Sequence, residues 1–148
     1  MNVQEKYQRL EDTVRQYNPG ANFDLIHAAF VYAEAHHRGQ NRKDGSPFIT
    51  HPLAVAQIVA QELHLDSESI AAALLHDTIE DTDATHEDIA RTFSPTIADI
   101  VEGVSKLTRV QAASKAEEQM ENLRKMLLAM SKDIRVILIK MADRLHNM

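Results

Sequence analysis

The chain has 148 residues, 44% of them hydrophobic, and its 16 Lys and Arg against 22 Asp and Glu give a formal charge of −6 at pH 7. This balance excludes broad, sequence-independent binding of nucleic acid, which requires a basic face. The absence of cysteine excludes disulfides, thiolate zinc sites and cysteine nucleophiles. The length suits one domain with a core of its own, and the eight histidines justify a search for a metal site.

The N-terminus lacks the charged and then apolar segments of a signal peptide. The longest apolar run, residues 70–75, is far too short to cross a bilayer. We therefore expect a cytoplasmic protein that makes no contact with a membrane.

The first half of the chain has helical periodicity interrupted by one polar stretch. A first helix is predicted for residues 4–17 and a second from about Asp24, and the second is apolar on almost every side, which indicates burial. Residues 38–50 contain glycines, a proline and several charges, so we expect a loop there. A third helix then opens at His51, followed by proline at the favoured first position, and Ser67 is the expected cap of a fourth.

The second half is also helical in pattern. Thr85 and Asp88 resemble a capping box for a short helix that ends near Phe93, and Ser94-Pro95 opens the next helix. After it we expect a weakly patterned connection over residues 108–118, then a helix marked by apolar residues from Met120 to Met130, and a last helix over residues 133–148. No strand, repeat or interdomain linker is evident. The pattern predicts an all-α single domain.

The fourth helix carries the clearest chemical signal. After the apolar residues 70–75 come His76, Asp77, Glu80 and Asp81. At about 100° per residue along a continuous helix, these four side chains share less than half of the circumference. Three close carboxylates raise one another's pKa and repel, and a divalent cation such as manganese, iron or zinc would relieve the repulsion. An acidic helix end that faces water is the alternative interpretation.

The last helix offers one more carboxylate. Asp143 lies on the same side as Val136 and Ile139, two apolar residues that an exposed face would not usually hold, so this second side is also expected to be covered. A buried carboxylate needs a partner, which is either Arg144 or a metal ion. The main core face of the helix is predicted on the opposite side, formed by Ile134, Ile137, Leu138, Met141, Leu145 and Met148.

The remaining candidates lie at the polar loop. His51 stands where the loop enters an apolar helix, a position that suits a metal ligand as well as a structural histidine. Arg42 and Lys43 are the nearest cations in sequence, and a guanidinium group can bind phosphate oxygens or stack on a base, although solvated loop charges are common. The other histidines are interpreted as packing or surface residues: His27, His36, His37, His64, His86 and His146.

Taken together, the order H…HD…D resembles the metal signature of the HD-domain phosphohydrolases. Four segments resemble the hydrolase domain of RelA/SpoT-type (Rel/Spo homologue) proteins, which handle the guanosine alarmones ppGpp and pppGpp. They are RKDGSPFITHPL (42–53), LLHDTIEDT (74–82), EGVSKL (102–107) and VILIKMADRLHNM (136–148). The resemblance spans about residues 24–148 and is far more specific than a single His-Asp dipeptide.

The resemblance implies a single HD-domain helical bundle over residues 1–148. Related hydrolase domains continue beyond the last matching segment with helices that help close the nucleotide pocket. We therefore expect a domain truncated at its C-terminus, a fragment of a longer multidomain protein whose synthetase and regulatory domains lie in the parent chain.

By the same resemblance, His51, His76, Asp77 and Asp143 would hold one manganese ion, and another divalent metal is also compatible with these ligands. The implied reaction is hydrolysis of the 3′-pyrophosphate of guanosine tetraphosphate or pentaphosphate. It releases pyrophosphate and leaves GDP or GTP, a reaction of the stringent response.

The resemblance also implies roles beside the metal. Glu80 and Asp81 match the pair that orients the attacking water or accepts its proton. Arg42, Lys43 and Asn147 match positions that line the nucleotide pocket. Because the chain keeps the whole of the HD…ED pattern, a competent hydrolase is favoured.

Two alternatives stay open from the sequence. An HD phosphohydrolase that acts on another nucleotide would keep the metal ligands but need not keep Arg42 and Lys43. A truncated, catalytically silent regulatory module would bind metal and nucleotide without turning anything over.

Overall fold

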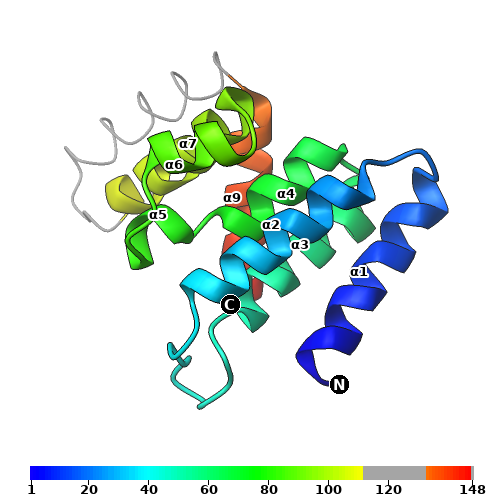
Figure 1. Cartoon of the computed structure of the whole chain (residues 1–148), viewed down its shortest axis with the longest axis horizontal. Coiled ribbons are helices and arrows are strands. Elements are labelled where there is room, and N and C mark those ends of the chain that lie inside the picture. Colours follow the sequence, from blue (N-terminus) through cyan, green and yellow to red (C-terminus); the bar gives the residue numbers. More distant parts are fainter. Residues whose placement is uncertain (112–132, 148) are drawn as a thin grey trace.

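The computed structural model describes residues 1–111 and 133–147, and within them the chain is helical with a single isolated bridge between Asn41 and Pro47. The prediction of an all-α domain is confirmed (Figure 1). The described helices are α1 (Val3–Tyr17), α2 (Phe23–His36), α3 (Thr50–Leu63), α4 (Ser67–Leu75), α5 (Thr78–Asp81), α6 (His86–Thr92), α7 (Pro95–Gln111) and α9 (Ile134–Asn147).

Several helix ends follow their sequence signals. Thr85 caps α6, and Thr85 and Asp88 form the predicted capping box, with Phe93 as the C-cap. Helix α7 begins at Pro95, as expected, but it continues to Gln111, so the predicted connection does not begin at residue 108. The rest of that connection and the helix predicted between Met120 and Met130 lie outside the described residues.

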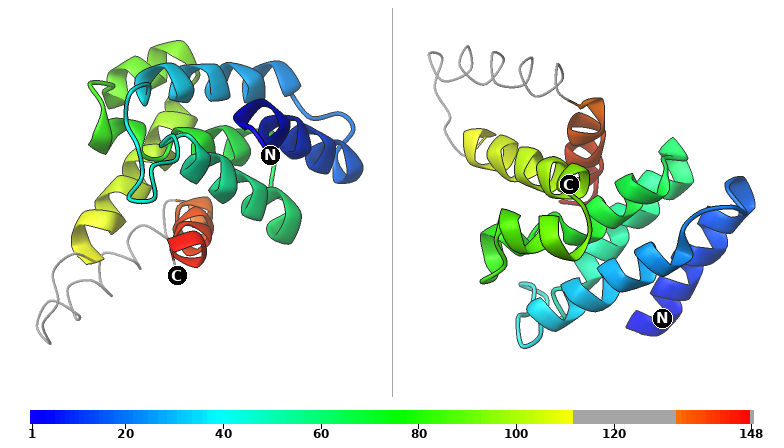
Figure 2. Two further views of the ribbon diagram at one scale, coloured as in Figure 1. Left: turned by 90° about the horizontal axis from the view of Figure 1, so that it is seen from below. Right: turned by 45° about the horizontal axis from the view of Figure 1, so that its top comes forward.

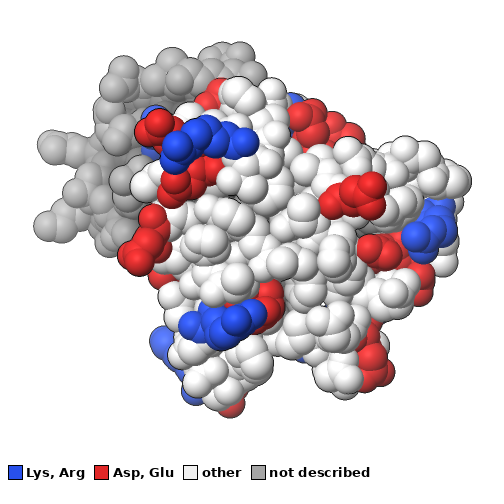
Figure 3. All heavy atoms as spheres, viewed as in Figure 1, with Lys and Arg blue, Asp and Glu red and all other residues white. Residues whose placement is uncertain are grey.

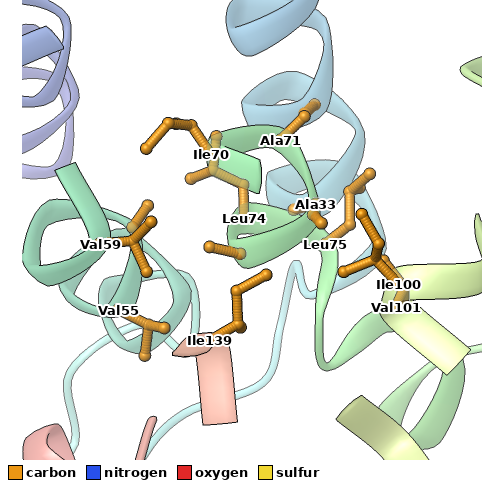
Figure 4. Close-up of a cluster of buried hydrophobic side chains, with 14 of the residues drawn as sticks. Ala33, Val55, Val59, Ile70, Ala71, Leu74, Leu75, Ile100, Val101 and Ile139 are labelled. Atoms are coloured by element: carbon orange, nitrogen blue, oxygen red, sulfur yellow. The ribbon is translucent and has the colours of Figure 1, made fainter. Parts of the chain in front are cut away.

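Helix α4 forms the centre of the core. Every residue from Ser69 to Leu75 is buried, because a short helix that is apolar on all sides can be covered from all sides. Helices α2, α3, α7 and α9 all contact it. Figure 4 shows Ile70 and Leu74 facing the valines of α3, and Leu75 beside Ile100 of α7. The residues that follow Leu75 therefore start at the centre of the core, and His76 and Thr78 are still buried.

The fourth helix does not continue to Asp81, and the prediction of one uninterrupted helix is wrong. Helix α4 ends at Leu75, and α5 starts at Thr78 after a turn formed by His76 and Asp77. The ring of His76 donates from Nδ1 to the carbonyl of Ala73 (2.6 Å), and the hydroxyl of Thr78 donates to the carbonyl of Leu75 (2.7 Å). Such side-chain hydrogen bonds compete with helix continuation. The turn thereby separates Asp77 from the two acidic residues of α5.

Helix α9 packs with the face opposite to the one predicted as its main core face. Val136, Ile139, Ala142 and Asp143 are buried, which confirms the expected second covered side. The apolar residues of the predicted core face are exposed or half-buried: Ile134 (55% exposed), Met141 (55%) and Leu145 (57%), with Ile137 and Leu138 intermediate. Met148 lies outside the described residues.

The buried face of α9 contacts α3 on one side and α7 on the other (Figure 2). At the α7 contact, a Cβ atom on Gly103 would lie 2.8 Å from Cγ2 of Val136, closer than side chains approach one another. Glycine therefore allows the two helices to pack closely, and this contact fixes the position of the helix that carries Asp143.

The surface carries charges of both signs. On the face drawn in Figure 3, the basic groups lie singly among acidic groups, in keeping with the formal charge of −6. None of the helices in the described part of the chain is long and apolar enough to span a membrane.

Candidate metal centre

The four side chains predicted as metal ligands meet at one point. His51 comes from the first turn of α3, His76 and Asp77 from the turn between α4 and α5, and Asp143 from α9. Nε2 of His51 lies 2.7 Å from Oδ1 of Asp143 and 3.6 Å from Oδ2 of Asp77. Nε2 of His76 lies 3.1 Å from Oδ2 of Asp77 and 3.4 Å from Oδ1 of Asp143. Residues from three separate segments thus present nitrogen and oxygen atoms to one another.

The donor set fits a divalent cation. His51, His76 and Asp143 are buried, and one ligand atom each from His51, His76 and Asp77 lie within 4.8 Å of one another. Because His76 donates from Nδ1 to a backbone carbonyl, its Nε2 can present a lone pair, and this buried atom has no hydrogen-bond partner in residues 1–111 or 133–147. Two imidazoles with two carboxylates match the preferences of manganese, iron or zinc.

The pKa values in this cluster show how strongly it attracts positive charge. Burial by itself would lower the pKa of His76, but Asp77 and Asp143 raise it to about 10. Burial would raise the pKa of Asp143, but the neighbouring His51 and His76 rings and the ammonium group of Lys140 hold it far below its ordinary value. A proton or a metal ion can supply this charge, and both would use Nε2 of His76.

Lys140 is a neighbour of the centre that the sequence reasoning missed. Its Nζ donates to Oδ2 of Asp143 at 2.6 Å, and both side chains are buried. Arg144, the partner considered from the sequence, is exposed instead. The i, i+3 spacing of Lys140 and Asp143 on one helix face was the signal that could have identified the contact. Lys140 holds one oxygen of Asp143, so the other oxygen faces the two histidines.

His146 was interpreted as a packing or surface residue, but it contacts a predicted ligand directly. Its Nδ1 lies 2.7 Å from Nδ1 of His51, and the two rings stack with centroids 4.9 Å apart. The sequence signal that could have identified this contact is its position three residues after Asp143, on the side of α9 that faces α3. The structure thus connects His51 to α9 through both of its ring nitrogens.

Glu80 and Asp81 lie on α5, just beyond Asp77. Among the described residues neither carboxylate is hydrogen-bonded to the four predicted ligands. Glu80 Oε1 accepts a hydrogen bond from the hydroxyl of Ser105 (3.0 Å). Burial, Asp77 and Glu80 together raise the pKa of Asp81. The pair therefore stands next to the centre, and one of its members is more basic than a free aspartate.

The loop between α2 and α3 connects to the centre through its arginine. The guanidinium group of Arg42 donates to Oδ1 of Asn147 (3.3 Å), and Nδ2 of Asn147 donates to Oδ1 of Asp143 (3.3 Å). The backbone of the loop folds back on itself, with the amide of Arg42 donating to the carbonyl of Ser46 (2.8 Å). Lys43 is exposed and is not brought into this chain of contacts.

A cavity of about 560 Å³ lies beside this chain of hydrogen bonds. It is lined by α1, the outer side of α3, the loop and the end of α9, and its size is that of a pocket for a small organic ligand. Three cationic side chains border it, Lys6, Arg9 and Arg42, together with His146 and one carboxylate, that of Asp44. The sequence reasoning missed the first two, because nothing local indicates that α1 faces the loop.

Comparison with known proteins gives concordant matches. The family model described as HD domain matches residues 29–148. "GTP pyrophosphokinase rsh" of Brucella melitensis biotype 1 is 52% identical over 139 residues, which are 94% of this chain and 18% of that protein. "Bifunctional (p)ppGpp synthase/hydrolase SpoT" of Escherichia coli K12 is 49% identical over 142 residues, 96% of this chain and 20% of that protein. The chain thus spans about a fifth of the length of these curated relatives.

A solved structure is also similar. It is described as "A metazoan ortholog of SpoT hydrolyzes ppGpp and plays a role in starvation responses". The match has a TM-score of 0.62 at 31% sequence identity and covers 83% of this chain and 67% of that one. The likeness therefore extends over most of the helical framework that holds the centre.

Proposed function

Since this chain belongs to the HD domain family and is a hydrolase domain of the RelA/SpoT type, we propose that it hydrolyses the 3′-pyrophosphate of guanosine tetraphosphate and pentaphosphate. The observation that carries the proposal is the meeting of His51, His76, Asp77 and Asp143 from three segments of the chain. The products would be pyrophosphate and GDP or GTP. Because the chain spans about a fifth of its curated relatives, synthetase and regulatory domains in a longer parent chain stay a prediction.

The proposed ligands of the divalent ion are the two histidines through Nε2 and the two aspartates through one oxygen each. Manganese is the proposed metal, and the nitrogen and oxygen donors are also compatible with other divalent ions. When bound, the ion would supply Lewis acidity at a phosphoryl oxygen and make a water molecule more acidic. Lys140 keeps the second oxygen of Asp143 occupied, which favours a single orientation of that ligand.

Glu80 and Asp81 are proposed to accept the proton of the attacking water and to direct its approach. Ser105 holds one oxygen of Glu80, which limits the rotation of that carboxylate. The raised pKa of Asp81 makes it a better proton acceptor than an ordinary aspartate. Attack of the water oxygen at the phosphorus bonded to the 3′ oxygen forms a new P–O bond, and the bond from phosphorus to the 3′ oxygen breaks. The water oxygen ends in pyrophosphate, and the 3′ oxygen takes up a proton to become the 3′ hydroxyl of GDP or GTP.

The nucleotide is proposed to occupy the cavity beside Arg42. Arg42 lines this cavity and is connected by hydrogen bonds, through Asn147, to Asp143, one of the proposed metal ligands. A nucleotide that carries several phosphates suits a pocket bordered by Lys6, Arg9 and Arg42 in a chain that is otherwise acidic. Lys43 would join them only when the loop side chains rearrange around a ligand.

The test is an assay of ppGpp with added Mn²⁺ on the wild type and on Asp77→Ala. We expect pyrophosphate and GDP from the wild type, loss of both from Asp77→Ala, and full activity from the control Asp99→Ala, which removes an exposed carboxylate whose partner is His86 at the surface. Chelation with EDTA should abolish the activity. Activity that persists in EDTA would contradict the role of the metal.

The same assay separates the alternatives. Turnover of another nucleotide in preference to ppGpp would indicate an HD phosphohydrolase of different specificity. Binding of ppGpp without pyrophosphate release, measured by calorimetry with Mn²⁺ present, would indicate a regulatory module instead of an enzyme.

A further inference from the structure

The contact between His51 and His146 assigns a role to a residue outside the proposed ligand set. The two Nδ1 atoms lie 2.7 Å apart, and the rings stack at an interplanar angle of 28°. Two ring nitrogens at this distance form a hydrogen bond only when one of them carries a hydrogen and the other presents its lone pair. The contact therefore links the tautomer of one histidine to that of the other.

The direction of the hydrogen bond follows from the other nitrogen of His51. Nε2 is the atom that faces Asp143 and Asp77, so a metal ion held there would need its lone pair. A neutral imidazole with a lone pair on Nε2 carries its hydrogen on Nδ1. That hydrogen can only be donated to Nδ1 of His146, because this is the atom that lies opposite it.

We propose that His146 is a positioning residue of the metal centre: it accepts the Nδ1–H of His51 and so keeps the Nε2 lone pair directed at the cation. This inference deepens the proposed function and rests on it. At the other imidazole, the carbonyl of Ala73 accepts the Nδ1–H of His76 (2.6 Å) and has the equivalent effect. Partners that orient ligating histidines in this way typically influence metal affinity by about 10- to 100-fold.

A packing role for His146 makes different predictions from a hydrogen-bonding role, and two substitutions separate them. His146→Phe keeps a ring that can stack on His51 but removes the acceptor. His146→Asn removes the ring but places a side-chain oxygen close to the position of Nδ1. His86 provides a matched control, because its Nε2 makes a hydrogen bond of 2.8 Å with Asp99 at the surface.

The first experiment is calorimetric titration of Mn²⁺ into the wild type and these variants. We expect His146→Phe to weaken Mn²⁺ binding by about 10-fold or more, His146→Asn to bind within about 3-fold of wild type, and His86→Phe to be unchanged. Circular dichroism without metal checks that each variant is folded. Wild-type affinity in folded His146→Phe, or equal loss in both His146 variants, would overturn the proposal.

The second experiment observes the tautomer directly. Ring nitrogen-15 shifts are measured on histidine-labelled protein with Zn²⁺, a diamagnetic probe of the same site. We expect every His51 ring to carry its hydrogen on Nδ1 in the wild type. In His146→Phe, we expect this single tautomer to be lost. Hydrogen on Nε2 of metal-bound His51 in the wild type would refute the inference.

Both readouts follow metal binding and not turnover. A protein that binds Mn²⁺ with the expected dependence on His146 but leaves ppGpp intact would retain this inference and refute the proposed function. A protein that hydrolyses ppGpp but binds Mn²⁺ equally well with and without His146→Phe would support the proposed function and refute this inference.

Discussion

Gly103→Ala tests whether α9 approaches α7 as closely as the structure has it. In an exposed helix the change would stabilise the fold by about 1 kcal/mol, because alanine is the better helix former. Here the new Cβ would lie 2.8 Å from Cγ2 and 3.1 Å from Cγ1 of Val136, a buried residue. Valine in a helix has one strongly preferred χ1 rotamer, so the two methyl groups cannot readily turn away from the new Cβ. Overpacking of this kind costs about 1–3 kcal/mol. We expect a net loss of about 1 kcal/mol.

The neighbouring valine supplies the control for this prediction. Val136→Ala alone should cost about 2 kcal/mol, since it removes two buried methyl groups. In that background the nearest remaining side-chain atom to a Cβ at Gly103 is the Cβ of residue 136, at the ordinary contact distance of 3.6 Å. Adding Gly103→Ala should then stabilise the protein by up to about 1 kcal/mol through helix propensity. The two substitutions would therefore be coupled by about 2 kcal/mol.

Urea unfolding followed by circular dichroism measures all four proteins of this cycle. A second readout is Mn²⁺ affinity, which should fall in Gly103→Ala because α9 carries Asp143. Stabilisation by Gly103→Ala in the wild-type background, with unchanged Mn²⁺ affinity, would refute the close packing of the two helices.

Three further outcomes are expected. Glu80→Gln should retain Mn²⁺ binding and lose most turnover; loss of Mn²⁺ binding in a calorimetric titration would make Glu80 a ligand instead. The pKa of His76 is raised to about 10, so near pH 7 a proton must leave before a cation binds, and Mn²⁺ affinity should rise with pH. Titrations in buffers of different ionisation enthalpy should detect about one proton released, and none released would contradict this reasoning. Lys6→Ala combined with Arg9→Ala should raise the KM for ppGpp more than it lowers kcat, while Arg91→Ala, which removes an exposed cation that does not line the cavity and pairs with Asp88, should change neither.

The fold class could be predicted because helix boundaries in this chain depend on local chemistry. Thr85 and Asp88 cap α6 through their own side chains, and Pro95 opens α7. The break after Leu75 was missed because hydrogen bonds from His76 and Thr78 to backbone carbonyls leave no trace in hydrophobic periodicity.

The orientation of α9 could not be predicted from its own composition. Met141 and Leu145 are exposed, while Ile139 and the smaller Ala142 are buried. The face that packs is selected by what other helices offer, including Gly103 of α7. A count of apolar side chains within one helix contains no information about that partner.

For the candidate site, the sequence pattern and the family resemblance identified groups that converge in space. They did not identify Lys140 or His146, because the importance of each depends on a contact with another side chain. His146 lies 95 residues from its partner in the chain, and only the packing of α9 against α3 makes them neighbours.

The four proposed ligands come from three distant segments of the chain. In a protein without cysteine, this has a consequence for folding. An ion held by α3, the α4–α5 turn and α9 would act as a reversible cross-link, the part that disulfides take in many small secreted domains. Its contribution would depend on concentration, reaching about 2.7 kcal/mol at 100 times the dissociation constant. A chelator would then loosen this domain as a reductant loosens a disulfide-bonded one, so its melting temperature would report the supply of metal.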